Sequence, residues 1–394
     1  MRKALVLVNP YFPYGDAISS RMLNFCRLLR DADWDVHVLT GHTMTSNAKV
    51  GETYNIEGIT YQYTTERRLS SVDSFIADHS FVKALKQYLK ENSVDAIFMN
   101  VSCELFMKVL KISKKYSIDL FVEQCEWLDV SIYKFRKADI RLWRTQRLRK
   151  KGFLLATGIV SISTFLNNYY VAAGAKTICV PTILDVKNTC FQHEVDYSGK
   201  IHLVFTGSIG GSKELLKPVL EALTEKEGYY RDRITIDIYG PSRRQIIENV
   251  GDEELLQKCG GSVQIHGRIP QEEVSRVLAA SHFLVFLRPQ RRSSNAGFPT
   301  KLAESMAVGT PVITNDTSDI ALYLRNKENG YLLTGNSKDD VIRCFDQLIL
   351  LDPDEYKLMR KHARSTAELS FDYRCYCKQV SDFFNGNNDT VIRE

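Results

Sequence analysis

The stretch that most constrains the fold of this chain is an alternation of strand and helix signals over residues 283–314. The apolar run 283–287 predicts a buried parallel strand, and a polar loop follows it. Residues 300–308 are rich in alanine and predict a short helix, which Gly309 ends. A turn at Pro311 then leads into another apolar strand. A strand, a loop, a helix and a second strand in this order predict a parallel sheet in an α/β fold.

The start of this predicted helix has the features of an anion-binding site. The first turn of a helix carries N–H groups without an acceptor inside the helix, and the helix dipole favours negative charge there. Thr300 and Lys301 lie in that turn and add a hydroxyl and an ammonium. Glu304 projects from the same face as Thr300 and would suit a pair of hydroxyls, such as a ribose diol. The segment therefore predicts a nucleoside-diphosphate site, although the same pattern also occurs in ordinary α/β connections.

The same alternation runs through the rest of the chain and predicts two α/β domains. We expect an N-terminal Rossmann-like domain over residues 1–180 and a linker over 181–199, where the periodicity disappears. A second Rossmann-like domain follows over 200–370, and a last helix over 371–385. Ser19 or Ser20 is the expected cap of the first helix. The predicted strands of the two domains are 4–8, 36–39, 60–64, 95–99, 120–122, 158–162, 176–180, 201–205, 234–239, 263–266, 283–287 and 330–333, with a further strand beginning at Val312.

Composition narrows the class of protein. The 394 residues suffice for two domains with full cores, and the net charge of +5 does not favour nucleic acid as a partner. Nine cysteines at irregular spacing, without a zinc pattern, suit reduced thiols in a cytosol. The first apolar run is too short for a signal peptide, and no run of 18 apolar residues predicts a membrane-spanning helix. We therefore expect a cytoplasmic protein.

Several motifs in the second half resemble the donor-site signature of GT-B glycosyltransferases, specifically the retaining GT4 group. They are Gly297-Phe298-Pro299, Glu304, Met306-Ala307 and the run from Gly309 to Ile313. The resemblance implies a GT-B fold, with two Rossmann-like domains facing across a cleft. It implies transfer of a sugar from a nucleotide-diphosphate sugar to a glycan or lipid-linked acceptor. The Pro-Thr-Lys-Leu form of the loop resembles a branch that builds bacterial envelope polysaccharides.

The resemblance also implies roles for individual residues. Glu304 matches the glutamate that binds the nucleotide ribose, whereas Ala296 stands where the family has a second glutamate that contacts the donor sugar. Ser208 replaces a family arginine, and Lys213 matches a family lysine on the diphosphate. Arg288 is our candidate for the missing cation, ahead of Arg291 and Arg292. The implied donor-binding set is Gly207, Arg268, Gly297, Phe298, Thr300, Lys301, Leu302 and Glu304, with Lys213 and Arg288 acting on the leaving diphosphate. We expect no metal, because no D-x-D triplet ends a predicted strand, and no other cofactor.

Three features of the N-terminal half extend the hypothesis. Gly15 lies in the loop that, in the family, reaches donor and acceptor, although it could be a plain turn glycine. Glu126, followed by Trp127, resembles a catalytic-site acidic position, and the alternative is an ion-paired loop residue. Residues 134–151 carry nine basic residues and one acidic one. This basic segment could contact the inner face of an anionic membrane or a lipid-diphosphate acceptor, or could be a solvated helix.

Other functions stay open at this point. A non-catalytic GT-B binding subunit is an alternative, because Ala296 and Ser208 have lost family side chains. A nucleotide-sugar epimerase or a phosphorylase could use the same fold, but the chain has no clear paired carboxylates or cofactor lysine. An NAD-dependent oxidoreductase is disfavoured by the missing G-x-G-x-x-G motif. Lys213 could also simply start a surface helix.

Overall fold

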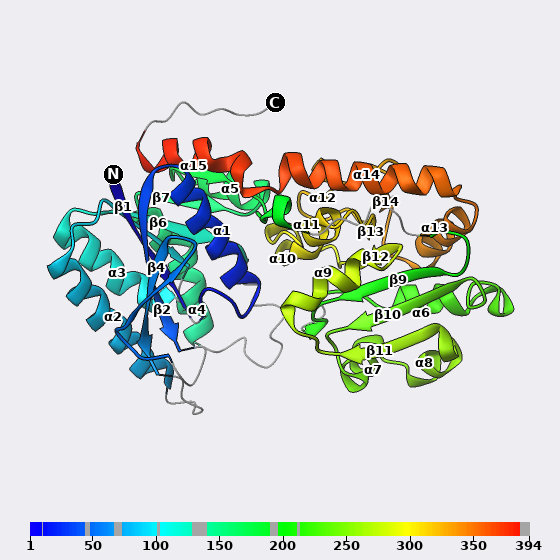
Figure 1. Ribbon diagram of the computed structural model, residues 1–394. Helices are drawn as coiled ribbons and strands as arrows, with labels where there is room; N and C mark the ends of the chain where they lie inside the picture. The colour runs from blue at the N-terminus through cyan, green and yellow to red at the C-terminus, as the bar shows by residue number, and fades with distance from the viewer. Residues whose placement is uncertain are drawn as a thin grey trace. The chain divides into compact units, whose positions relative to one another are not determined.

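The chain forms two compact units. The first combines Met1–Leu184 with the C-terminal stretch that begins at Tyr373, and the second is Asp185–Asp372. The division at residue 184 falls inside the range 181–199 that the sequence indicated as a linker, and residues 185–199 group with the second unit. The computed structural model, drawn in Figure 1, describes residues 1–9, 11–43, 48–66, 73–100, 103–127, 140–189, 196–210 and 213–386.

The first unit contains one sheet with helices packed against it (Figure 1). Its strands are β1 (Arg2–Val8), β2 (Trp34–His42), β3 (Thr53–Ile56), β4 (Ile59–Thr65), β5 (Ala96–Asn100), β6 (Asp119–Gln124), β7 (Gly158–Ser161) and β8 (Thr177–Cys179). Its helices are α1 (Ala17–Asp31), α2 (Asp73–Glu91), α3 (Cys103–Tyr116), α4 (Ile140–Arg147), α5 (Thr164–Ala172) and α15 (Cys377–Phe384), with shorter turns η2 (Leu148–Gly152), η3 (Phe153–Leu155) and η8 (Tyr373–Tyr376).

The sheet of the first unit has the strand order β3-β4-β2-β1-β5-β6-β7-β8. All neighbours pair in parallel except β3, which is antiparallel to β4. The sequence reading missed β3, because its four residues alternate between exposed and half-buried positions and lack an apolar run. The side chains of β1 from Ala4 to Val8 are fully buried, as its continuous apolar run predicted.

The cap of α1 differs from the prediction. Asp16 is the N-cap residue, and its carboxylate accepts hydrogen bonds from the N–H and the hydroxyl of Ser19 at 2.8 and 2.9 Å. Ser19 therefore lies inside the first turn, and Ser20 follows it. Aspartate caps helices as well as serine does. Because Asp16 precedes both serines and its carboxylate reaches the N–H of Ser19, it is the cap, and α1 begins at Ala17.

The second unit repeats the design. Its strands are β9 (Ile201–Thr206), β10 (Ile234–Tyr239), β11 (Val263–Gly267), β12 (Phe283–Val285), β13 (Val312–Asn315) and β14 (Gly330–Leu333). Its helices are α6 (Lys217–Thr224), α7 (Arg243–Val250), α8 (Glu253–Cys259), α9 (Gln271–Ala279), α10 (Arg292–Ala296), α11 (Thr300–Ala307), α12 (Ile320–Tyr323), α13 (Lys338–Ile349) and α14 (Pro353–Ser370), with turns η4 (Val186–Asn188), η6 (Lys226–Gly228) and η7 (Gly260–Ser262).

The second sheet is parallel throughout, in the order β11-β10-β9-β12-β13-β14. From β9 the chain builds the sheet outward to β11, and it then returns to β12 on the other side of β9. The boundary between β9 and β12 is therefore the point where the strand order reverses. In open α/β sheets, ligands bind beyond the carboxyl ends of the strands at such a point.

The C-terminal helix packs on the first unit. The ring of Phe384 stacks on Phe121 of β6, with centroids 4.0 Å apart, and also contacts Trp34. A Cβ at Gly158 would lie only 2.5 Å from the ring of Phe383, so α15 approaches β7 at a position without a side chain. Helix α15 thus belongs to the same unit as the N-terminal strands, although α14, the preceding α-helix, belongs to the second unit.

Candidate functional site

Two loops meet at the strand-order reversal of the second sheet. Gly207 directly follows β9, and Arg288 follows the short strand β12. The chain after Arg288 passes through α10 and enters α11, whose first turn contains Thr300 and Lys301. The sequence predicted a continuous loop before α11 and missed α10, which has only five residues. These elements bring the residues that are predicted to bind a diphosphate to one edge of one sheet.

Lys301 lies at the centre of this edge. Its Nζ is 2.5 Å from Oε2 of Glu214, and both side chains are about nine-tenths buried. The ammonium also lies 4.4 Å from the ring centroid of Phe205, at the end of β9. Burial lowers the pKa of Lys301, while the charge of Glu214 acts in the opposite direction and favours the ammonium form. The sequence reading found Lys301 but not its partner, which lies 87 positions earlier.

Arg288 is the second cation of the cluster. Its guanidinium donates to the carbonyl oxygen of Gly297 at 3.2 Å and to Oγ1 of Thr317 at 3.3 Å. Burial lowers the pKa of Arg288, and the charge of Glu214 opposes this effect. An arginine has five N–H donors, so these two bonds leave capacity for an anion. The contact with Gly297 ties Arg288 to the loop that leads into α11.

Glu304 lies one turn after Lys301 on α11. Nε2 of Gln271, the first residue of α9, donates to its Oε1 at 3.3 Å. Burial raises the pKa of Glu304, and the charge of Lys301 and the bond from Gln271 act against this rise. The carboxylate therefore lies against the start of α9 and close enough to Lys301 for the two charges to interact. Gln271 is a contact that the sequence reading missed, because it depends on packing between two helices.

Glycine permits a close approach of backbones at this site. Gly207 has φ +110°, and a Cβ there would lie 3.1 Å from Nζ of Lys301. Gly240, after β10, has φ +114°, and its Cβ would lie 2.1 Å from the carbonyl oxygen of Gly207. Side chains are strained at such φ values. The ends of β9 and β10 can therefore lie this close together only with glycine at position 240, whereas a side chain at position 207 would approach the ammonium of Lys301.

Part of the chain matches a known protein family, and nearly the whole chain superposes on solved structures. Residues 192–366 match the family described as glycosyl transferases group 1. The chain has the GT-B fold, and we call the matched residues 192–366 the group 1 domain. The sucrose-phosphate synthase of Thermosynechococcus elongatus superposes with a TM-score of 0.75 and 15% identity, over 98% of this chain and 99% of that one. These findings confirm the GT-B fold that the donor-site motifs predicted.

Two further relatives extend the comparison. HepE of Anabaena, solved in complex with UDP and glucose, gives a TM-score of 0.66 at 13% identity and covers 98% of this chain and 100% of its own. The amylovoran biosynthesis glycosyltransferase AmsK of Erwinia amylovora is 33% identical over 101 residues. That matched stretch is 25% of this chain and 23% of AmsK, so it spans about a quarter of the relative.

Two residues of the predicted donor set belong instead to the core of the group 1 domain. The ring of Phe298 is buried against Tyr323 and Phe371, with centroids 5.5 and 5.8 Å away. Leu302 is fully buried, and its N–H already donates to the carbonyl of Pro299 at 3.1 Å. Both side chains support α11 from behind and do not face the polar edge. Their side chains therefore support the loop, and a role of these two residues in donor binding stays a prediction.

The remaining sequence-predicted positions of the group 1 domain differ in exposure. Lys213 is exposed and directly precedes Glu214; α6 begins only at Lys217, so the alternative that Lys213 starts a helix is wrong. Arg268 is exposed in the turn after β11. Its neighbour His266 pairs with Asp237 at 2.6 Å. Thr300 is half-buried, and Ala296 is fully buried at the end of α10. Gly211 and Ser212 lie outside the described residues.

The first unit holds the predicted residues outside the group 1 domain. Gly15 has φ +136°, and a Cβ there would crowd Tyr11 at 3.1 Å, so the turn requires glycine. Glu126 is exposed after β6, and its carbonyl accepts a hydrogen bond from Arg149 at 3.1 Å. The nearby Glu123 is buried and pairs with Arg21 at 2.5 Å, which is a structural contact. Functional roles for Gly15 and Glu126 stay predictions.

Part of the basic segment 134–151 can be described. Residues 134–139 lie outside the described residues, and α4 and η2 form the remainder. Trp143 is 60% exposed, and Nζ of Lys150 lies 5.5 Å from the ring centroid of Trp127. None of the helices within the described ranges is long and apolar enough to cross a membrane. Contact of this segment with a membrane surface stays a prediction.

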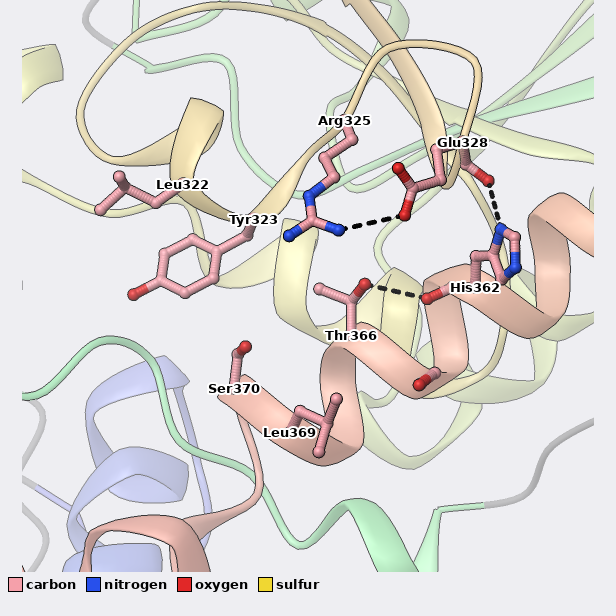
Figure 2. A pocket seen from close by; sticks show the side chains of 9 residues that line it. Leu322, Tyr323, Arg325, Glu328, His362, Thr366, Leu369 and Ser370 are labelled. Atoms are coloured by element: carbon pink, nitrogen blue, oxygen red, sulfur yellow. Dashed lines mark hydrogen bonds and ion pairs between the residues drawn. The ribbon is translucent and has the colours of Figure 1, made fainter. Parts of the chain in front are cut away.

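A pocket elsewhere in the group 1 domain is lined by other residues (Figure 2). There Arg325 pairs with Glu328 at 3.1 Å, and Nδ1 of His362 donates to the carbonyl of Glu328 at 3.2 Å. The predicted donor residues do not line this pocket. No group of three or more His, Cys, Asp or Glu side chains that could hold a metal ion occurs among the residues that the structure describes.

Proposed function

We propose that the protein is a glycosyltransferase that moves a sugar from a nucleotide-diphosphate sugar to a glycan or lipid-linked acceptor. The observation that carries the proposal is the convergence of Lys301, Arg288 and Glu304 at the strand-order reversal of the second sheet. This edge offers two cations and the N-terminus of α11 to one anionic group. The group 1 family match over residues 192–366 supports the same reaction class.

Each part of the cluster has a role in donor binding. Lys301, Arg288 and Lys213 would hold the diphosphate, together with the N–H groups of the first turn of α11. Glu304 would accept hydrogen bonds from the ribose hydroxyls, and Arg268 lies at the turn where the nucleobase would rest. Gly207 allows the backbone after β9 to approach the ligand. HepE, a protein of the same fold, was solved with UDP and glucose, which supports a diphosphate ligand at such a site.

The chemistry follows from the placement of positive charge. As the bond from the anomeric carbon to the diphosphate breaks, negative charge grows on the leaving oxygen, and Lys301, Arg288 and Lys213 would stabilise it. We propose retention of the anomeric configuration, with the acceptor attacking from the face that the diphosphate leaves. A diphosphate oxygen would take the acceptor proton, so a separate general base is not needed. We expect the cationic side chains to meet the charge without a metal.

The proposed context is bacterial surface polysaccharide synthesis at the cytoplasmic face of the membrane. The name of AmsK places that relative in amylovoran biosynthesis, and the similarity to it supports a polysaccharide product. The exposed Trp143 beside the basic residues of η2 supports a peripheral contact with anionic lipid. The acceptor would then be bound by the first unit, where Gly15 and Glu126 are candidates for contact.

A thermal-shift screen tests the proposal directly. The purified chain is measured with UDP, GDP, ADP, CMP and dTDP, and with NAD as the control. A ligand at one hundred times its dissociation constant stabilises a protein by about 2.7 kcal/mol, which the method detects. We expect one nucleoside diphosphate to raise the unfolding temperature. A shift with NAD alone, or with none of these ligands, would refute the donor-site assignment.

Donor hydrolysis separates the enzyme from a non-catalytic binding subunit. The subunit alternative is favoured by Ser208 and Ala296, where the family has charged side chains. The sugar donor of the nucleotide found in the screen is incubated with the protein, and release of free sugar is followed over hours. Slow hydrolysis that disappears in Lys301→Met supports a transferase. Binding without any hydrolysis supports the subunit.

A further inference from the structure

Glu214 is an unexpected anion in a site built to bind an anion. Its carboxylate takes one of the three donor positions of the Lys301 ammonium at 2.5 Å, and its charge also acts on Arg288. A diphosphate at this edge would share the same ammonium. Before any ligand arrives, the two cations are balanced by Glu214 and Glu304. These four charges therefore cancel, so the positive charge that remains comes from Lys213 and the N-terminus of α11.

The position of Glu214 is fixed by its backbone. Asn249 of α7 donates to the carbonyl of Glu214 at 3.0 Å and accepts from the N–H of Leu216 at 3.4 Å. The N–H of Leu215 donates to the carbonyl of Leu287 at 2.8 Å, which ties the segment to the chain just after β12. Three hydrogen bonds thus hold residues 214–216 against two neighbouring elements. With its backbone held there and its carboxylate paired with Lys301, Glu214 lies beside the position that a bound diphosphate would take.

We propose that Glu214 makes the site bind the sugar nucleotide in preference to the free nucleoside diphosphate, and so promotes release of the product. This inference rests on the proposed function. A sugar nucleotide carries one negative charge on each phosphate. When the bond to the sugar breaks, the terminal phosphate gains a second ionisation with a pKa near 6, so the product is more negative at neutral pH. A fixed carboxylate on the shared ammonium opposes that additional charge.

The expected effect follows from Coulomb's law. One additional unit charge a few ångströms from Glu214, in a partly solvated site, changes the relative affinities by roughly three- to tenfold. Glu214→Gln keeps the size of the side chain and an oxygen that can accept from Lys301, but it removes the charge. Glu225→Gln is the matched control, because Glu225 pairs with Lys338 at 2.6 Å in the same unit.

The experiment is a set of calorimetric titrations with the full chain. Wild type, Glu214→Gln and Glu225→Gln are each titrated with the nucleoside diphosphate found in the thermal screen and with its glucose conjugate. We expect Glu214→Gln to lower the ratio of the product Kd to the donor Kd by roughly three- to tenfold, while Glu225→Gln leaves it unchanged. An unchanged ratio, or weaker product binding in Glu214→Gln, would overturn the inference.

Two further outcomes are distinguished by the same design. If wild type binds neither ligand, the proposed function itself fails, and the inference fails with it. If Glu214→Gln does not fold, wild type alone is titrated at about pH 5.5 and pH 7.5, below and above the second ionisation of the product phosphate. The ratio of the product Kd to the donor Kd should rise with pH, and a ratio that falls or stays constant would overturn the inference.

Discussion

The close approach of the β9 and β10 ends predicts that Gly240 tolerates no side chain. A Cβ at Gly240 would lie 2.1 Å from the carbonyl oxygen of Gly207 and 2.9 Å from its carbonyl carbon. The two backbones cannot separate freely, because the N–H of Gly207 donates to the carbonyl of Tyr239 at 3.0 Å and the N–H of Gly240 donates to the carbonyl of Gly267 at 2.7 Å. Gly240→Ala must therefore break or distort these contacts.

The expected loss of free energy of unfolding in Gly240→Ala follows from comparison with Gly251→Ala, the matched control. Gly251 ends α7 at φ +72°, and nothing lies within 4 Å of a Cβ built there. Alanine at Gly251 should cost only the left-handed backbone strain of about 1–2 kcal/mol. Gly240→Ala carries a comparable strain, and overpacking adds about 1–3 kcal/mol. We expect Gly240→Ala to lower the free energy of unfolding by about 1–3 kcal/mol more than Gly251→Ala.

The assay is urea unfolding of the full chain with two probes. Far-UV circular dichroism follows both units, whereas the three tryptophans, Trp34, Trp127 and Trp143, all belong to the first unit. Gly240→Ala should shift the transition of the second unit in circular dichroism. Unfolding midpoints that coincide for Gly240→Ala and Gly251→Ala would refute the reasoning, because the overpacking would then cost nothing.

Three further predictions concern single carboxylates and one histidine. Glu304→Ala should weaken binding of the nucleoside diphosphate by about 1.5–3 kcal/mol in calorimetry, as for a charged hydrogen bond, and unchanged affinity would exclude its ribose role. Glu123→Gln leaves buried Arg21 without its carboxylate and should destabilise the first unit by about 3–5 kcal/mol in tryptophan fluorescence; a loss below about 1 kcal/mol would contradict this. Burial lowers the pKa of His37 to about 4, so the stability it contributes is present above pH 6.5 and is lost as the pH falls towards 4, by about 3 kcal/mol. His37→Phe, which keeps a ring against Tyr88, should remove that part of the pH dependence, and an identical pH profile would refute it.

The elements that the sequence predicted well are those set by local rules. The strand at Phe283 and the helix from Thr300 to Ala307 lie within a few residues of their predicted bounds, because an apolar run and a glycine stop act over short distances. The buried position of Leu302 had a local signal too. It shares the apolar stripe of α11 with Met306, whereas Lys301 and Glu304 form the polar one. That pattern predicts a buried side chain for Leu302, whatever part its backbone has in donor binding.

The features that the sequence did not reveal depend on contacts between distant segments. Phe298 is buried because Tyr323 and Phe371 close over it, and neither partner is near it in the chain. Lys301 could be placed at a helix start from its neighbours, but its pairing with Glu214 requires the loop after β9 to fold back to α11. Gln271 reaches Glu304 only once α9 and α11 are packed together. A sequence pattern can identify each of these residues, but it does not show which two of them will be in contact.

The charged groups of the site act on one another: Glu214 acts on both Lys301 and Arg288, and Glu304 acts on Lys301. Where the resemblance implies an arginine after the first glycine of the β9 loop, this chain has Ser208, whose hydroxyl accepts from the N–H of Gly210 at 3.2 Å. The buried cations at this edge are instead Arg288, which follows β12, and Lys301, which comes from α11 and pairs with Glu214. Burial lowers the pKa of Lys301, and the charge of Glu214 opposes this effect, as the charge of a bound diphosphate would. The same carboxylate therefore favours the ammonium form of Lys301 in the free site and limits how much negative charge the site retains when the diphosphate is bound.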